Sequence, residues 1–281
     1  MQKIALITDS ACDLDLNTLR ENNINLLPLR ITYSYGDYRD RIDISPSEVY
    51  DNLEKEVPKT SLPSAKDIED TLEKIEKEGY THVICISISS GLSGSYNAVR
   101  LALEDHPNLT SFVYDSKILA YPQGEIVVET AKLIKEGKTF EEIIEELPNI
   151  REKIIGYFTI NTLEYLKKGG RIGRLAGTVG EFLQLKPIVT TDENGIYYNV
   201  AKVRGRKQSL SKMTEILKGY LEKDKCEVAI LHAGCEDEAI KYMNSIKDLP
   251  NVTSIKIAEI SPALGVHGGP GLIGFSVKLV K

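Results

Sequence analysis

One loop combines the residue types that bind an anion, Ser87-Ile88-Ser89-Ser90-Gly91-Leu92-Ser93-Gly94-Ser95. It follows an apolar run from His82 to Ile86, which predicts a buried strand, and it precedes residues 96–103, which predict a helix. The first N–H groups of a helix have no partner inside the helix, and the helix dipole favours negative charge there. Because the loop holds five serines and no basic residue, it predicts a site that binds an oxygen-rich anion through neutral donors.

The same loop is also compatible with two other interpretations. It lacks the lysine of a phosphate-binding P-loop. Gly91 to Ser95 matches the nucleophile elbow G-x-S-x-G at every position but the last, where Ser95 replaces the glycine. The chain order Ser93, Asp115, His267 matches that of α/β-hydrolases, so a serine esterase or acyl hydrolase is the alternative hypothesis. A turn that only caps the next helix accounts for the composition about as well.

Two further loops carry candidate binding groups. Thr60 and Ser61 stand in a hydroxyl cluster that ends at Ser64, which is explained by itself as the N-cap of the following helix. His267 lies in a glycine-rich segment, residues 261–271, which we expect to be a loop that lets the backbone approach a ligand closely. His267 is then a hydrogen-bond donor to a carboxylate or a base, although a simple linker is an equal alternative.

Two basic segments stand out on an acidic chain. One runs from Lys167 to Arg174 around a Gly-Gly pair, and the other is Arg204-Gly205-Arg206-Lys207. Each alone is typical of a solvated surface. Together they indicate contact with a phosphate group or with an acidic partner.

The elements around these loops predict an α/β protein with two domains. In the first half strands and helices alternate, which indicates a parallel sheet covered by helices. Ligands of such sheets bind beyond the carboxyl ends of the strands, where Asp9-Ser10, the serine loop and Asp115-Ser116 all fall. After residues 149–156 the pattern changes, and Asp192 to Gly195 marks a hairpin between two strands. We therefore expect an N-terminal parallel-sheet domain, residues 1–152, and a C-terminal domain with a mixed or antiparallel sheet, residues 153–281.

Composition limits the class of protein. The chain has 281 residues, 42% of them hydrophobic, and a formal net charge of −6, which argues against a nucleic-acid partner. Its four cysteines show no metal-ligand spacing and are expected to be reduced thiols. The start of the chain shows no signal segment, and no apolar run approaches the ~20 residues that span a bilayer. We expect a cytoplasmic monomer without metal or cofactor and with at most transient membrane contact.

The candidate loops together resemble the DegV family of bacterial fatty-acid-binding proteins. The matching segments follow the family order along the whole chain. They are Asp9-Ser10, Thr60 to Ser64, Ser89 to Ser95, Asp115-Ser116, Leu166 to Ile172, Lys186-Pro187, Arg204 to Arg206 and His267 to Gly271.

The resemblance implies a lipid-binding protein rather than an enzyme. A long-chain fatty acid would be buried in a tunnel and presented to a separate fatty acid kinase, which makes the acyl-phosphate. By the same resemblance Thr60, Ser61 and Ser93 hold the carboxylate with His267 near it. Arg171, near the mouth, and Arg204 would contact the phosphorylated head group or the partner.

Physical chemistry agrees with this implication. A buried carboxylate must be hydrogen-bonded, and neutral hydroxyls do this without strong charge pairing. Each buried methylene contributes about 0.8 kcal/mol, so the tail supplies most of the affinity and the head group needs no buried Arg or Lys. A binding domain for another small anion is a third hypothesis, which a short polar pocket would favour.

The sequence also departs from the usual family pattern. Leu62 stands where Gln is common, and Gly268 stands where Thr is common. Ile118 to Gly124 replaces a run of small residues, and we expect Tyr121 and Pro122 to narrow or reshape the tunnel.

Overall fold

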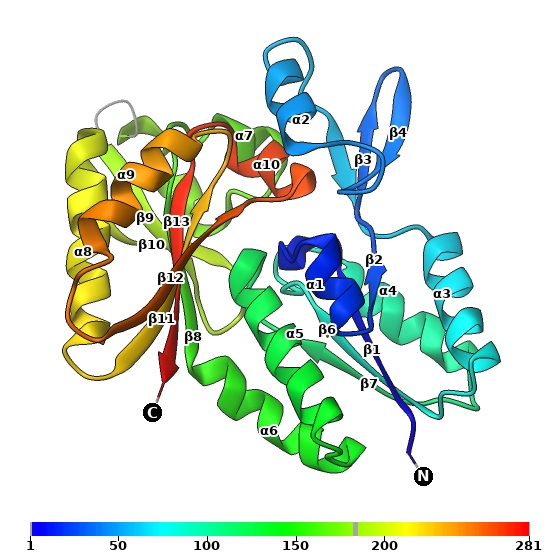
Figure 1. Cartoon of the computed structure of the whole chain (residues 1–281). Helices are drawn as coiled ribbons and strands as arrows, with labels where there is room; N and C mark the ends of the chain where they lie inside the picture. Colours follow the sequence, from blue (N-terminus) through cyan, green and yellow to red (C-terminus); the bar gives the residue numbers. More distant parts are fainter. Residues whose placement is uncertain (1, 182–184, 281) are drawn as a thin grey trace.

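A computed structural model describes residues 2–181 and 185–280. It contains three sheets with helices around them (Figure 1). The first sheet is parallel, with the strand order β2-β1-β6-β7. Its strands are β1 Ile4–Asp9, β2 Ile24–Leu27, β6 His82–Ser87 and β7 Thr110–Asp115, and the helices of this region are α1 Leu16–Glu21, α3 Ala65–Lys77, α4 Ser95–Ala102, α5 Ala120–Lys135 and α6 Phe140–Glu152.

A small antiparallel sheet projects from this domain together with one helix (Figure 1). It consists of β3 Arg30–Tyr33, β4 Gly36–Arg39 and β5 Lys59–Ser61, and the helix is α2 Pro46–Asn52. Ser45 and Glu48 form a capping box at the start of α2, and Ser64 caps α3 by accepting a hydrogen bond from the Asp67 backbone N–H (3.1 Å). The expected structural role of Ser64 is confirmed.

The second half of the chain forms a mixed six-stranded sheet in the order β10-β9-β8-β13-β11-β12, in which β11 and β12 are parallel. Its strands are β8 Ile154–Thr159, β9 Leu185–Thr191, β10 Tyr197–Arg204, β11 Lys225–His232, β12 Val252–Glu259 and β13 Ile273–Val280; its helices are α7 Glu164–Lys168, α8 Gly205–Leu221, α9 Glu236–Ile246 and α10 Pro262–Gly268. Short 3-10 turns are η1 Ser10–Cys12, η2 Leu103–Asp105 and η3 Gly173–Glu181. The two α/β domains and the mixed sheet agree with the expected fold class.

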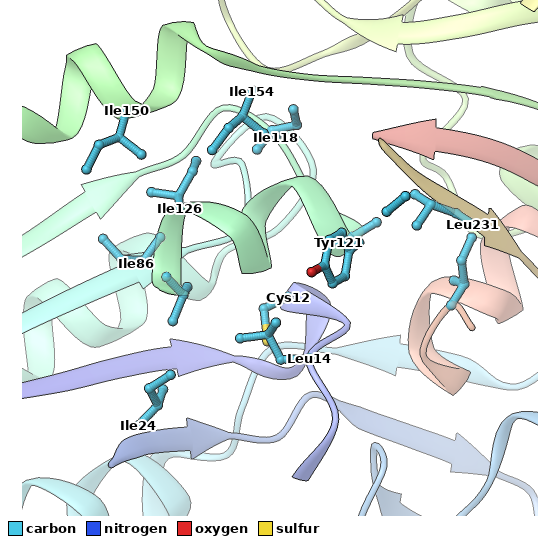
Figure 2. Close-up of a cluster of buried hydrophobic side chains, with 14 of the residues drawn as sticks. Cys12, Leu14, Ile24, Ile86, Ile118, Tyr121, Ile126, Ile150, Ile154 and Leu231 are labelled. Carbon is cyan, nitrogen blue, oxygen red and sulfur yellow. The ribbon is translucent and has the colours of Figure 1, made fainter. Parts of the chain in front are cut away.

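Helix α5 joins the two domains through a shared core. Figure 2 shows buried side chains that run from Ile86 of the parallel sheet, through Ile126 of α5, to Ile154 and Leu231 of the mixed sheet. The boundary between residues 152 and 153 stays a prediction. In the structure, Glu152 ends α6 and Ile154 begins β8.

Residues 24–33 form two strands, β2 and β3, in different sheets, and Pro28 between them cannot donate a ladder hydrogen bond. Helix α5 begins at Ala120, and Pro122 lies in its first turn, where a proline is tolerated. One local expectation was wrong. The expected glycine-rich loop around His267 is the helix α10, followed by Gly269 and Gly271 at positive φ. Of the described helices, none is long and apolar enough to cross a bilayer.

Candidate functional site

The serine loop is held at its start by a buried carboxylate. Asp9, the last residue of β1, accepts hydrogen bonds from the Ile88 backbone N–H (2.8 Å), Ser87 Oγ (3.1 Å) and Gln123 Nε2 (3.1 Å). Burial raises the pKa of this carboxyl despite these donors. Asp9 therefore fixes the loop to the end of the parallel sheet.

The middle of the loop is held by contacts with Asp115 and Gly195. The Asp115 carboxylate accepts hydrogen bonds from the Ser90 backbone N–H (3.0 Å) and the Ser90 hydroxyl, and it pairs with Lys117 Nζ (2.8 Å). Ser89 Oγ donates to the Gly195 carbonyl in the hairpin of the second domain (2.9 Å). Ser89 and Ser90 thus have a structural role, because their hydrogen bonds fix the position of the rest of the loop.

Ser93 differs from these serines because it faces a cavity. Its Oγ accepts a hydrogen bond from the Ser95 backbone N–H (3.2 Å) and lies 2.8 Å from Ser95 Oγ, at the start of α4. The cavity has a volume of about 460 Å³, counting the space open to solvent. Its lining residues are Leu29, Thr60, Ser61, Ile88, Leu92, Ser93, Leu119, Arg171, Tyr197, Ala263, Leu264 and His267. We call it the head cavity.

The head cavity contains a hydrogen bond between residues far apart in the chain. Thr60 Oγ1 of β5 lies 2.6 Å from His267 Nε2 of α10. Burial, assisted by the positive charge of Arg171, lowers the pKa of His267 to about 4, so the imidazole is neutral near pH 7. Its Nδ1 is buried and has no hydrogen-bond partner among the described residues. The imidazole is therefore a neutral hydrogen-bonding group whose ring nitrogens are only partly satisfied.

Arg171, which was predicted near the mouth, lines the head cavity and is half-buried. Its contact with a head group or a partner stays a prediction. The guanidinium donates to the Gly169 carbonyl (2.7 Å) and the Leu92 carbonyl (3.3 Å), which leaves it with further N–H donors. The cavity thus has a fixed positive charge beside its hydroxyls, because the turn after α7 folds back onto the serine loop.

A second, apolar cavity adjoins the first. It has a volume of about 580 Å³, again counting the space open to solvent. Its lining residues are Ile118, Leu119, Ala120, Pro122, Gly156, Tyr157, Phe158, Leu166, Thr190, Thr191, Tyr197, Leu231, Ile260, Leu264, Gly268 and Leu272. The two cavities share Leu119, Tyr197 and Leu264, so they meet at these side chains. We call this second space the tail cavity.

The sequence alone did not single out these three shared residues. Leu119 precedes α5, Tyr197 begins β10 and Leu264 belongs to α10. Tyr197 is buried and packs edge-on against Phe158, with ring centroids 5.4 Å apart. A hydrophobic residue at a strand start carries no local signal of a binding role, so only the packing of the two domains reveals them.

The geometry does not assemble a catalytic triad. The Asp115 carboxylate contacts Ser90 and Lys117, whereas His267 Nε2 contacts Thr60. Ser93 Oγ contacts Ser95. Because a triad needs its three side chains hydrogen-bonded in series, the serine esterase alternative is not supported. Within the part of the chain that the structure describes, no group of three or more acidic, His or Cys side chains forms a metal site.

The comparisons with known proteins agree with this architecture. A family profile described as "Uncharacterised protein, DegV family" matches residues 3–279. This chain belongs to the DegV family. A DegV domain-containing protein of Clostridium perfringens is 51% identical over 278 residues, which is 99% of each chain.

Solved DegV structures have the same fold. The fatty-acid-binding DegV protein from Streptococcus agalactiae is 31% identical, with a TM-score of 0.92 and 100% of both chains covered. A DegV protein from Eubacterium eligens, described as loaded with heptadecanoic acid, is 26% identical, with a TM-score of 0.83 over 99% of this chain and 100% of the other. Proteins described as binding or holding fatty acids thus match the fold of this chain over nearly its whole length.

The departures from the usual DegV pattern lie in different places. Leu62 is exposed and lines neither cavity. Tyr121 also lines neither cavity, and Lys256 Nζ lies 4.3 Å from the centroid of its ring. Pro122 does line the tail cavity. Gly268 also lines the tail cavity. A Cβ at position 268 would lie 2.6 Å from Leu272 Cδ1, so Leu272 fills the space that a larger side chain at this position would need.

The last predicted residue, Arg204, lies elsewhere. It is exposed at the end of β10, immediately before α8, and lines neither of the two cavities. A contact between Arg204 and a partner stays a prediction.

Proposed function

We propose that this DegV protein binds a long-chain fatty acid, with its carboxylate in the head cavity and its chain in the tail cavity. The observation that carries the proposal is the junction of a cavity rich in hydrogen-bonding groups with an apolar one. Thr60, Ser61, Ser93 and His267 supply hydroxyl and imidazole groups to the carboxylate. The apolar wall accepts methylenes, each worth about 0.8 kcal/mol on burial.

Arg171 adds charge complementarity to this arrangement. A carboxylate in a partly dry site is costly unless charged or polar groups compensate it. The guanidinium already bonds two backbone carbonyls, so it holds a fixed position and offers its remaining donors to the ligand. Burial, assisted by this charge, keeps His267 neutral, so the site does not acquire a second cation near pH 7.

We further propose that the protein acts as a carrier and not as a catalyst. Among the described residues, the Ser93 hydroxyl is hydrogen-bonded with Ser95 at a helix start, whereas the His267 imidazole is hydrogen-bonded with Thr60. By the family resemblance, a separate fatty acid kinase phosphorylates the bound acid, with Arg171 and Arg204 toward the phosphate or the partner. A binding site for a small anion alone would not explain the tail cavity.

Binding is tested on delipidated protein by titration calorimetry with palmitate, oleate and methyl palmitate. We expect tight binding of both acids and clearly weaker binding of the ester, which lacks the charged head group. Ser93→Ala should weaken binding of the acids several-fold. Ser90→Ala is the matched control, because its hydroxyl bonds Asp115 outside the head cavity.

Other results would contradict the proposal. If neither acid binds and native mass spectrometry finds no co-purified lipid, the protein is not a fatty acid carrier. Labelling of Ser93 by a fluorophosphonate would instead revive the esterase alternative. The kinase role is tested by acyl-phosphate formation from the loaded protein with ATP and a fatty acid kinase.

A further inference from the structure

Helix α10 forms part of the wall of both cavities. Ala263, Leu264 and His267 line the head cavity, and Leu264 and Gly268 line the tail cavity. The helix belongs to the C-terminal half of the chain, between β12 and β13, but it packs against α2, β3 and β5 of the N-terminal half. Figure 1 shows α10 beside this projecting part of the molecule. The contacts that hold α10 in place therefore also help to enclose both cavities.

Two buried aspartates of the N-terminal half hold the start of α10. Asp13 Oδ1 accepts a hydrogen bond from the Ser261 backbone N–H (2.9 Å), and Asp40 Oδ1 accepts one from the Ala263 backbone N–H (3.0 Å). The Ser261 side chain makes no capping hydrogen bond of its own. Since the first N–H groups of a helix need outside partners and favour negative charge, these carboxylates replace the usual local cap.

Arg41 completes this contact. Its Nη2 donates to the Glu259 carbonyl (2.8 Å) and pairs with Asp13 Oδ1 (3.3 Å). Asp40 is fixed in turn by Ser10 Oγ, which donates to Asp40 Oδ2 (2.5 Å). Asp13, Asp40 and Arg41 thus form hydrogen bonds with the backbone on both sides of the turn from β12 into α10.

This contact also contains unsatisfied polar atoms and unfavourable backbone conformations. Asp13 Oδ2 and Arg41 Nε are buried without a hydrogen-bond partner among the described residues. Both residues have left-handed backbone conformations, with φ of 52° for Asp13 and 63° for Arg41. Unsatisfied buried groups and left-handed non-glycine residues both cost free energy. The surrounding contacts offset this cost.

We propose that Asp13, Asp40 and Arg41 form an interdomain latch that keeps α10 closed over the ligand and positions His267. This inference rests on the proposed function, because it assumes that a fatty acid occupies the cavities. A buried chain leaves only when part of its enclosure moves. The latch holds a short helix that lines both cavities, so its strength sets the rate of exchange.

The test compares variants at Asp40 by stopped-flow release of a bound fluorescent fatty acid. Asp40→Ala removes the acceptor for the Ala263 N–H, and we expect release at least tenfold faster than in the wild type. Asp40→Asn keeps an acceptor oxygen and should bring the rate back to within about threefold of the wild type. Glu125→Gln is the matched control, since Glu125 is also a buried carboxyl but bonds Ser276 between α5 and β13.

Hydrogen exchange on the ligand-free proteins gives a readout that does not depend on lipid binding. We expect faster exchange of the segment 259–268 in Asp40→Ala, with the core of the parallel sheet unchanged. Unaltered exchange and release in a folded Asp40→Ala protein would overturn the latch. If that variant does not fold, Arg41→Gln takes its place with the same two outcomes. Failure of the wild type to bind any fatty acid would defeat the proposed function, whereas the exchange result would still decide whether the latch exists.

Discussion

Thr60 Oγ1 lies 2.6 Å from His267 Nε2, although 207 residues separate the two in the chain. The contact joins β5 of the small projecting sheet to α10 of the other half of the molecule. Because His267 stays neutral well below pH 7, the pair is a hydroxyl–imidazole hydrogen bond and not a charged contact. It holds two potential carboxylate partners in place before a ligand arrives, which lowers the entropy cost of binding.

Replacement of Thr60 by valine tests this arrangement. The change keeps the shape of the side chain but removes the hydroxyl, so a carboxylate loses a partner worth about 1.5 kcal/mol, or roughly tenfold in affinity. Titration calorimetry with palmitate measures the effect. Thr71→Val is the control, because the Thr71 hydroxyl bonds the Asp67 carbonyl within α3. Equal affinities for the two variants would remove Thr60 from the carboxylate site.

Gly169 provides a test of His267 that does not alter the histidine. A Cβ at Gly169 would lie 2.0 Å from His267 Nδ1, and the backbone there (φ −78°) suits any residue. We expect Gly169→Ala to displace the imidazole, to shift its NMR resonances and to weaken fatty acid binding at least tenfold.

The neighbouring Gly170 is the control for this substitution. Its φ is +71° and no atom lies within 4 Å of its added Cβ. Gly170→Ala should cost about 1 kcal/mol of folding stability through its backbone alone and leave the affinity unchanged. Normal fatty acid binding by Gly169→Ala with a displaced ring would show that His267 is dispensable.

The width of the tail cavity depends on a contact between Gly156 and Pro122. A Cβ at Gly156 of β8 would lie 2.8 Å from Pro122 Cγ of α5, and both residues line the cavity. Gly156→Ala should therefore reduce affinity for an 18-carbon acid more than for a 12-carbon acid. Adding Pro122→Ala should restore the long-chain affinity. If the ratio of the two affinities does not change in either variant, this contact does not determine chain preference.

Glu125 should make stability depend on pH. Burial raises the pKa of its carboxyl to about 7, and its hydrogen bond from Ser276 and the charge of Lys278 offset this only in part. Between the ordinary glutamate pKa and pH 7 the folded protein keeps a proton that the unfolded chain has lost, so stability falls as the pH rises through this range.

Denaturant unfolding of Glu125→Gln at pH 5 and pH 8 tests this prediction. The substitution removes the titrating group, so the loss of stability between these pH values should be smaller than in the wild type by about 2 to 3 kcal/mol. Asp13 and Asp40, whose pKa values burial raises to about 6 and about 7, remain in both proteins. Their contribution cancels in the comparison. Identical pH dependence of the two proteins would show that Glu125 ionises freely in the folded state.

Local signals in the sequence were sufficient for much of the fold. The capping residue Ser64 was identified from the sequence alone, because a helix cap depends only on residues within one turn. The hairpin from Asp192 to Gly195 is present between β9 and β10 for the same reason, with Gly195 at a φ of +72°. The ordered loops also identified the family, since each motif is contiguous in the chain.

Only the tertiary structure decided how these loops combine. It brought Thr60, Ser93 and His267 to one cavity, added Arg171 to its wall and placed Tyr197 at its junction with the tail cavity. It also converted the expected loop around His267 into a helix, because the carboxylates that hold the start of that helix come from residues more than 220 positions earlier. Side chains that meet through the packing of two domains have no shared local pattern, so the sequence by itself names the motifs but not their contacts.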